Sequence, residues 1–444
     1  MKRVICVIAL FGAVITASAA EVEKAISLSM EEAVNIALSE NPTIKIAELE
    51  VERYDYVRKT TMGSLLPQVS VDGTLNQTLQ SQSMARGFSF GGDQYTTMTA
   101  TGNVSLALYA PTVYRTLKMN NTEAEAAVES ARSSRIELVA AVKGSFYAVM
   151  LAERSLEVLL ESSKTSKETM DETQVKFDNG LSAEYDLLTA QVQYSNLQPT
   201  IIATRSSIEN AKNLLKMYLS IPLDVEVQVK GDLDDLHDMV VRKSANLSRD
   251  ISGNSSLRSL ALSEEILSHQ LRINNATRLP TLSAYGTINY TGNNMDSFSL
   301  DGSDTDTTAT SDFFWQTPSS VGLSLSIPIF SGLTRTNTSR QIKNQISQLE
   351  LQRRYTEDSV NVSLSTAISD INSAREQLFA QQQTVDQAIK AYEISNTRYT
   401  AGAGTILELN TARLTMTQAE LNLSQAIYDL LIAKAEYDRI IGVE

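Results

Sequence analysis

The chain has 444 residues, of which 52 are acidic and 38 are lysine or arginine, so its formal net charge is −14 at pH 7. This acidic balance argues against a nucleic-acid-binding protein, because that class presents a basic face to the phosphates. The two histidines, His237 and His269, stand apart, and the sequence has no phosphate-binding loop, metal-ligand spacing or nucleophile motif. The composition therefore predicts no enzyme, no metal site and no cofactor.

The first twenty residues have the pattern of a secretory signal peptide. Met1 to Arg3 is positive, Val4 to Ile15 is apolar, and Ala17 to Ala19 offers small residues at cleavage spacing. We expect residues 1–20 to be removed, together with Cys6, the only cysteine. No later stretch reaches the roughly 18 apolar residues of a transmembrane helix, so a chain that spans a membrane would have to do so as a closed β-barrel.

Two helices are predicted next, over 30–39 and 42–65. Ser29 and Glu32 have capping-box spacing at the start of the first helix. Pro42 suits the first turn of the second helix, where a missing N–H has no consequence.

Two strands follow, over 68–79 and 97–108, because the hydrophobic period changes to two. In each strand the residues of one parity are apolar, such as Val69, Val71 and Leu75, and those of the other parity are polar. Strands of this length with one wholly polar face fit a membrane barrel with a wet interior. Half of a soluble β-sandwich is the alternative at this point.

A helix of about 65 residues is predicted over 112–176, a stretch without proline. Apolar residues recur every seven positions along it, at Leu117, Ala124, Ala131 and Leu138. Such a helix is roughly 100 Å long, which is typical of a coiled coil or helical barrel. A return helix follows over 183–219, in which Pro199 bends the helix or marks a junction, and then a short strand over 225–229.

The second half repeats this plan, with helices and strands predicted over 256–277, 281–289, 320–329, 334–398 and 405–440. The strand entries correspond, since Leu-Pro, Ser, Gly-Thr and Asn recur at the same offsets after positions 65 and 278. Matched positions lie roughly 213 to 222 residues apart, a period that indicates duplication of one large unit. We therefore expect a first structural repeat over 21–235 and a second over 236–444.

Two glycine-tipped turns, one in each half, join the long helices to their return helices. An aromatic residue stands three positions before each glycine, and a carboxylate stands six positions after it. The matched pairs are Phe177 and Tyr399, Gly180 and Gly402, Asp186 and Glu408, and Thr189 and Thr411. We expect these turns to be the tips of two long helical hairpins and to carry the function.

Four strands cannot close a barrel, for which about eight are the practical minimum. Three copies of the chain would supply twelve strands, an even number of the kind that membrane barrels have. In each half, two shorter helices together match the long one, so we expect them to meet end to end beside it. The predicted fold is an α+β membrane protein, a trimeric 12-stranded β-barrel with four strands per protomer, continuous with a long α-helical barrel of coiled-coil hairpins.

On these features the sequence resembles the TolC-like outer-membrane factor family, the outer membrane efflux proteins. The resemblance covers essentially the whole mature chain and rests on the opening segment Leu28 to Pro42, the two Leu-Pro strand entries, the duplication and both tips. It implies a homotrimeric exit duct for efflux or type I secretion, with its barrel in the outer-membrane lipid of a Gram-negative-type bacterium and its helices in the periplasm. It also implies two partners, a periplasmic adaptor (membrane fusion) protein and an inner-membrane transporter of the RND or ABC type.

The resemblance also implies a gate at the tips, where the family uses tyrosine, arginine and aspartate contacts and rings of acidic side chains. Asp186 corresponds to the acidic partner of the first repeat, Tyr399 to the tyrosine and Glu408 to a constriction carboxylate. Two positions depart from this pattern, because Gly404 replaces an arginine of some members and Thr411 replaces a second aspartate. We therefore expect a weaker and less pH-dependent latch. The alternative is that Asp186 and Glu408 are solvated acids that favour the helix dipole.

The same resemblance implies that the turns receive the adaptor's own hairpin tip, through Asn179, Gly180, Leu181, Ala401, Gly402 and Ala403. Glycine adopts a positive φ at such a turn and lets another backbone approach closely. The alternative, that each glycine only ends a helix, is compatible with docking. A trimeric surface stalk or adhesin with a barrel anchor is the alternative function, and it predicts a filled polar coiled-coil core and no partner pump.

Overall fold

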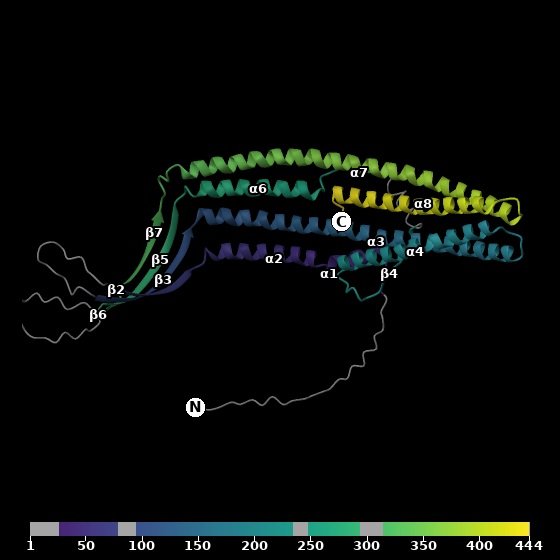
Figure 1. The fold of residues 1–444 in the computed structure, drawn as a ribbon. Coiled ribbons are helices and arrows are strands. Elements are labelled where there is room, and N and C mark those ends of the chain that lie inside the picture. Colours follow the sequence, from purple (N-terminus) through teal and green to yellow (C-terminus); the bar gives the residue numbers. More distant parts are fainter. Residues whose placement is uncertain (1–25, 79–94, 234–246, 294–313, 444) are drawn as a thin grey trace, which may run out of the picture. The chain divides into compact units, whose positions relative to one another are not determined.

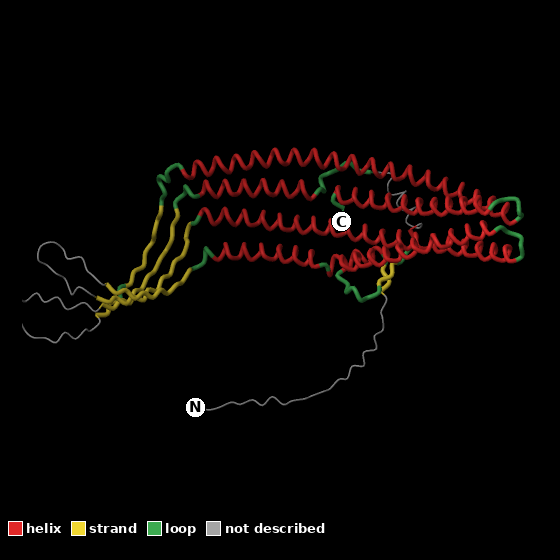
Figure 2. The backbone as a smooth tube through the Cα atoms, viewed as in Figure 1, coloured by secondary structure: helices red, strands yellow, loops and turns green. Residues whose placement is uncertain are grey.

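The computed structural model describes residues 26–78, 95–233, 247–293 and 314–443 (Figure 1). The predicted signal peptide and His237 lie outside the described residues. Most of the described chain is helical and the remainder contains strands, so the fold is α+β (Figure 2). Among the residues that the structure describes, no helix combines the length and the apolar character that crossing a membrane requires.

The helices are α1 (Met30–Glu40), α2 (Pro42–Gly63), α3 (Pro111–Asp178), α4 (Glu184–Leu219), α6 (Ser255–Ala276), α7 (Thr334–Thr400) and α8 (Ile406–Ile441). The strands are β1 (Ile26–Leu28), β2 (Gln68–Thr78), β3 (Tyr95–Tyr109), β4 (Val227–Val229), β5 (Thr281–Asn293), β6 (Phe314–Gln316) and β7 (Ser319–Ser326). The predicted helices and the four long strands are confirmed, with shifts of a few residues at their ends.

The chain folds as two compact units. Unit 1 takes its described residues from Met1–Asn41, Ala141–Ala245 and Ser373–Ile432, and unit 2 takes its own from Pro42–Ala140, Asn246–Asn372 and Ala433–Glu444. Each unit thus draws on both halves of the sequence. The boundaries at 21–235 and 236–444 describe a repeat in sequence and stay a prediction.

Unit 2 contains an antiparallel sheet. Strand β2 pairs with β3, β3 with β5, and β5 with β7, while the short β6 continues alongside β5. The central pair, β3 and β5, joins the two halves of the sequence. Within the described ranges, β2 pairs with no second strand on its outer edge, and neither does β7.

One face of this sheet is apolar, as the alternation predicted. Directly paired residues share a face, and one apolar row crosses the sheet through Val69, Val104, Gly286 and Val321. The apolar side chains of this face have few neighbours among the described residues: Val71, in the next row of the same face, is 79% exposed, and Val321 is 89% exposed.

The other face of the sheet is polar. Thr101 donates its hydroxyl to the side-chain oxygen of Asn289 across strands (2.7 Å), and the hydroxyls of Thr287 and Ser320 share a hydrogen bond (2.8 Å). Hydroxyl and amide groups of neighbouring strands therefore satisfy one another on this face.

Three features of the secondary structure differ from the prediction. Strand β7 ends before Pro328, because proline cannot donate a ladder hydrogen bond. Pro199 lies inside α4 and marks no junction, because the helix continues past it to Leu219, whereas a bend at Pro199 stays a prediction. Strand β1 was not predicted, and it pairs in parallel with β4 in unit 1.

The end of α8 meets the start of α6 within unit 2. Arg132 of α3 donates to the carbonyl oxygens of Gly253 (2.5 Å) and Gly442 (3.1 Å) and ties the two ends together. Asn254, the N-cap of α6, donates its Nδ2 to the carbonyl oxygen of Ile440 (2.8 Å). The predicted meeting of two shorter helices end to end is confirmed at this junction.

Unit 1 contains the corresponding amide contact. Asn41, directly before α2, donates its Nδ2 to the carbonyl oxygen of Tyr218 near the end of α4 (2.8 Å). Asn41 and Asn254 lie 213 positions apart in the sequence, and their acceptors, Tyr218 and Ile440, lie 222 apart. Both asparagines are buried, at 6% and 8% exposed. This correspondence is what a duplicated unit with the predicted period would produce.

We predict that Gly253→Ala weakens the junction between α6 and α8. A Cβ at Gly253 would meet the carbonyl oxygen of Ile441, and a Cβ at Gly442 would meet the carbonyl oxygen of Gly253, so the two backbone segments lie in close contact here. Overpacking of this kind costs about 1–3 kcal/mol, so thermal unfolding followed by circular dichroism should show a lower Tm. Gly63→Ala is the control, because a Cβ there meets nothing within 4 Å. Equal losses in both variants would contradict the close contact.

Candidate functional site

Each helical hairpin of unit 1 turns at a glycine in the left-handed conformation, with φ of 72° at Gly180 and 71° at Gly402. In the first turn the residue after the glycine donates its N–H to the carbonyl five residues earlier (2.7 Å), and the glycine donates to the carbonyl three residues earlier (2.9 Å). The second turn repeats both bonds at 2.8 and 3.1 Å. This is the Schellman arrangement, so both glycines do end a helix. Figure 1 shows the two turns at one end of the unit.

The predicted docking residues form the outer surface of these turns and are all exposed: Asn179, Gly180, Leu181, Ala401, Gly402 and Ala403. Leu181 is 79% exposed. A Cβ at Gly180 or Gly402 would meet nothing within 4 Å. The backbone conformation, and not crowding within the chain, therefore requires glycine at both positions.

For three predicted gate residues, the hydrogen-bond partners among the described residues lie within four positions in the sequence. Asp186, half-buried in the first turn of α4, accepts a hydrogen bond from the Ser182 hydroxyl (3.3 Å). Glu408 accepts from the backbone N–H of Thr405 (3.4 Å) at the start of α8. Thr411 is exposed and donates to a carbonyl of its own helix (2.8 Å). Both carboxylates stand in the first turn of a helix, where the dipole favours negative charge.

Tyr399, the fourth predicted gate residue, connects the two hairpins. Thr173 donates its only hydroxyl proton to the carbonyl of Thr169 (2.7 Å), so its oxygen accepts from the Tyr399 hydroxyl (3.0 Å). The ammonium group of Lys176 lies 4.6 Å from the centroid of the same ring. Within the described chain Tyr399 therefore contacts α3, and its predicted acidic partner, Asp186, is not brought to it.

Two arginines near the turns were not predicted from the sequence. Arg398 donates to the carbonyl of Ala403 (3.3 Å) and lies 3.8 Å from the carboxylate of Glu408, with both charged side chains about half exposed. Arg413 of α8 is only 1% exposed. Arg413 belongs to a buried series of α8 at 4-3-4 spacing, positions 406, 410, 413 and 417, but three of these four residues are polar, so no apolar pattern in the sequence indicated it.

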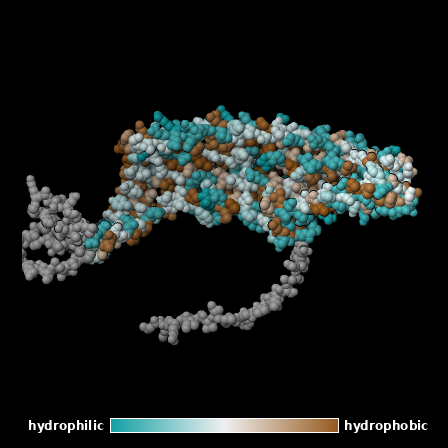
Figure 3. All heavy atoms as spheres, viewed as in Figure 1, coloured by the Kyte–Doolittle hydropathy of each residue, from teal (hydrophilic) through white to brown (hydrophobic). Residues whose placement is uncertain are grey.

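An apolar groove of about 520 Å³ lies between α4 and α8 beside the turns. Its lining comprises Tyr185, Leu188, Thr189, Val192, Gln193, Leu407, Asn410, Thr411 and Leu414. Figure 3 shows hydrophobic side chains at this end of the unit. Thr411, the position where an aspartate was expected by resemblance, thus lies between two exposed leucines of α8, Leu407 and Leu414.

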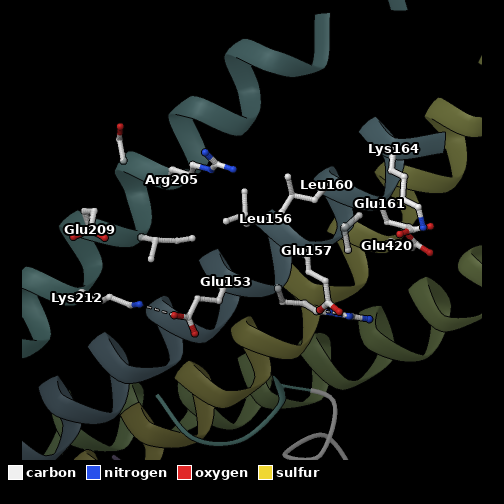
Figure 4. Close-up of a pocket in the computed structure, with 14 residues that line it drawn as sticks. Glu153, Leu156, Glu157, Leu160, Glu161, Lys164, Arg205, Glu209, Lys212 and Glu420 are labelled. Atoms are coloured by element: carbon white, nitrogen blue, oxygen red, sulfur yellow. Dashed lines mark hydrogen bonds and ion pairs between the residues drawn. The ribbon is translucent and has the colours of Figure 1, made fainter. Parts of the chain in front are cut away.

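Another groove of unit 1, of about 910 Å³, lies between α3 and α4 with Glu420 of α8 at its edge (Figure 4). Lys212 and Glu153 form an ion pair across it (2.8 Å). Burial raises the pKa of the Glu420 carboxyl; Arg154 opposes this rise and Glu161 adds to it. The described residues contain no group of three or more His, Cys, Asp or Glu that could hold a metal ion.

The comparisons with known proteins agree with one another. The sequence profile of the family described as "Outer membrane efflux protein" matches residues 33–220 and 246–443. The alkaline protease secretion protein AprF of Pseudomonas aeruginosa is 24% identical over 433 residues, covering 95% of this chain and 86% of the relative. The outer membrane protein TolC of Vibrio cholerae is 22% identical over 391 residues, covering 86% and 83%.

Solved structures show the same fold. The CmeC outer membrane channel of Campylobacter jejuni has a TM-score of 0.72 to this chain at 16% identity, covering 93% of this chain and 85% of its own. The family consists of channel proteins rather than enzymes. The profile matches well over half of the chain, so the protein belongs to the outer membrane efflux protein family, is of the TolC type, and is located in the outer membrane of a Gram-negative cell, extending into the periplasm.

Proposed function

We propose that this protein is the exit duct of a tripartite efflux or type I secretion system, a passive channel gated at its periplasmic hairpin tips. One observation carries the proposal: among the described residues, the outer edges of the sheet of unit 2 have no partner strand, and one face of this sheet exposes apolar side chains. The family and the relatives AprF and TolC support the general role.

The open sheet supports the proposal of a trimer. Unpaired strand edges tend to pair with another chain, and three copies that join β2 of one to β7 of the next supply twelve strands, enough to close a barrel. The face that carries Val71 and Val321 then meets outer-membrane lipid, and the face that carries Thr101 and Ser320 lines a wet lumen.

The exposed turns supply a docking surface for a periplasmic adaptor protein. Leu181 offers an apolar contact beside the first turn, and the glycines leave room for another backbone to approach. The adaptor would link the duct to an inner-membrane transporter of the RND or ABC type, which selects the cargo. No nucleic-acid partner is proposed, given the net charge of −14.

The gate at these tips would be held by few contacts. The Arg398–Glu408 pair lies within one hairpin and is exposed, and such pairs contribute only about 0–1 kcal/mol. The bond from Tyr399 to Thr173 is neutral, and Gly404 supplies no arginine. Three copies around an axis would multiply these small contributions without adding a strong one.

A trimeric surface stalk or adhesin is the competing function, and it is not favoured. It does not explain why the chain belongs to an efflux family. It also gives no role to two exposed glycine turns at one end of unit 1.

We predict that Val71→Arg prevents insertion, whereas Ser70→Arg on the opposite face of the same strand is tolerated. An arginine on the lipid face of a membrane strand costs about 2–4 kcal/mol near the bilayer midplane, and an arginine facing water does not. Quantitative immunoblotting of outer-membrane fractions measures the result. Equal amounts of both variants in the membrane would contradict the assigned faces.

We predict that the turn glycines serve docking as well as backbone geometry. Gly402→Asn keeps the left-handed turn, because asparagine tolerates this conformation, but it adds a side chain where the adaptor would approach. Efflux or secretion should fall at least about fivefold with unchanged protein in the membrane, and Gly402→Trp should abolish it. Gly332→Asn is the control, because Gly332 has a similar left-handed φ of 61° and a Cβ there also meets nothing within 4 Å. Full transport by Gly402→Asn would show that the glycine only shapes the turn.

We predict that the purified trimer conducts without its partners in planar bilayers. Because the gate contacts are weak, Asp186→Asn and Tyr399→Phe should each raise the conductance by less than about fivefold. The conductance should also change little between pH 5 and pH 8, because the bond from Tyr399 to Thr173 is neutral and the Arg398–Glu408 pair is exposed and weak. A nearly silent channel that opens only when Asp186 or Tyr399 is replaced would contradict the weak gate.

A further inference from the structure

Hydroxyl groups form the interface between α3 and the α7–α8 hairpin near the tips. The α3 residues of this interface follow 4-3-4 spacing and are all buried: Ser162, Ser166, Thr169 and Thr173. Thr417 of α8 donates to Ser162 (2.9 Å), and Tyr399 of α7 donates to Thr173. Seams with this spacing are normally apolar. We call these four residues and their partners the hydroxyl seam.

Arg413 of α8 is the largest side chain in the hydroxyl seam and is 1% exposed. Its Nη1 donates to the Ser166 hydroxyl (3.3 Å) and its Nη2 to that of Thr169 (2.7 Å). The guanidinium also lies 5.6 Å from the ring centroid of Tyr392. Its buried Nε has no hydrogen-bond partner.

Among the residues that the structure describes, no carboxylate forms an ion pair with Arg413. Arginine stays protonated in proteins, and its partners in the part of the chain that the structure describes are two neutral hydroxyls and an aromatic ring. Because the side chain is enclosed within a single chain, a neighbouring copy cannot reach it in this conformation. A full positive charge is therefore buried against neutral groups.

The α7–α8 hairpin itself is held together differently. Val385 and Ala388 of α7 pack against Ala419 of α8, and Ile389, Met416 and Leu423 join them. An apolar interface resists separation because it excludes water, whereas neutral hydroxyl contacts exchange with water at little net cost. Farther from the turns, Leu421 of α8 packs against the apolar cluster that contains Leu159 of α3. Nearer the turns, the hydroxyl seam is therefore a weaker contact of α8 than its apolar interface with α7.

The charge of Arg413 is unfavourable while the hydroxyl seam is closed and becomes favourable when the seam opens to water. A buried charge without a partner is unfavourable, and it becomes favourable once water reaches it. We propose that Arg413 is an opening element, a buried cation that favours separation of the α7–α8 hairpin from α3 along the hydroxyl seam. Its consequence for transport rests on the proposed gate at the tips. The opposite role, a clamp that holds α8 on α3, predicts the opposite sign for the same variants.

Thiol labelling of Thr173→Cys in the purified full-length protein tests directly whether Arg413 favours opening or closure of the hydroxyl seam. Thr173 is 0% exposed, so a charged thiol reagent reaches this position only when the seam separates. Arg413→Met should slow labelling about tenfold, because an apolar side chain in place of an unpaired buried charge is stabilising. Ser166→Asp should also slow labelling, because the new carboxylate pairs with the guanidinium. Combining both changes should reverse the effect, since the carboxylate is then buried alone.

Arg439→Met is the matched control, because Arg439 lies on the same helix in an exposed pair with Glu436, and it should leave the rate within about twofold. Faster or unchanged labelling in Arg413→Met, or no labelling of Thr173→Cys in the parent, would overturn the inference. Ser166→Asp keeps the test decisive if Arg413→Met does not fold. Bilayer conductance of the same variants separates the two proposals: slower labelling with unchanged conductance supports the opening element and contradicts a gate at the tips.

Discussion

The unpaired edges of β2 and β7 place the strongest physical demand on this chain. A strand edge in hydrocarbon must find partners for its N–H and C=O groups, because lipid offers none. The same sheet exposes apolar side chains such as Val71 and Val321 on one face, where water is unfavourable. Copies of the chain that close the sheet in lipid would meet both demands together. In the proposed duct, assembly and membrane insertion are therefore consequences of one sheet.

Unit 1 uses polar contacts in a different way. Within the α7–α8 hairpin the interface is apolar, and towards α3, nearer the turns, it contains hydroxyls around a buried arginine. Helices joined by an apolar interface move together, because separating them would expose apolar surface to water. Helices joined by hydroxyl groups separate more easily, because water replaces the hydrogen bonds between them. The residues of the hydroxyl seam thus determine that α8 separates from α3 more readily than from α7. The seam lies near the two glycine turns, where the partner is proposed to dock.

Long periodic elements could be predicted from the sequence, because their pattern is repeated many times. The helices α3 and α7 have 68 and 67 residues, and β2 and β3 alternate over 11 and 15. The turns at Gly180 and Gly402 were also predictable, since few residues other than glycine adopt their φ. The three-residue strand β1 could not be predicted, because it is too short to show a period.

Side-chain partners were harder to predict than backbone elements. The contact between Arg132 and Gly442 joins residues 310 positions apart, so no local pattern indicates it. Tyr399 contacts Thr173 rather than Asp186. Thr173 belongs to a seam of hydroxyl residues, and such residues interrupt the apolar pattern by which a buried helical interface is recognised in a sequence. Arg413 was missed for the same reason, although its spacing placed it on the buried face.

Disulfide formation between the two sheet edges in native membranes tests the central claim most directly. Ser70→Cys on β2 would be combined in turn with cysteine at positions 320, 324 and 326 of β7, all on the polar face. Paired strands lie about 4.8 Å apart, within reach of a disulfide. Our account predicts that at least one combination gives a covalent trimer as the largest species on a denaturing gel. Chains that stay monomeric in every combination, or a ladder that continues beyond the trimer, would contradict it.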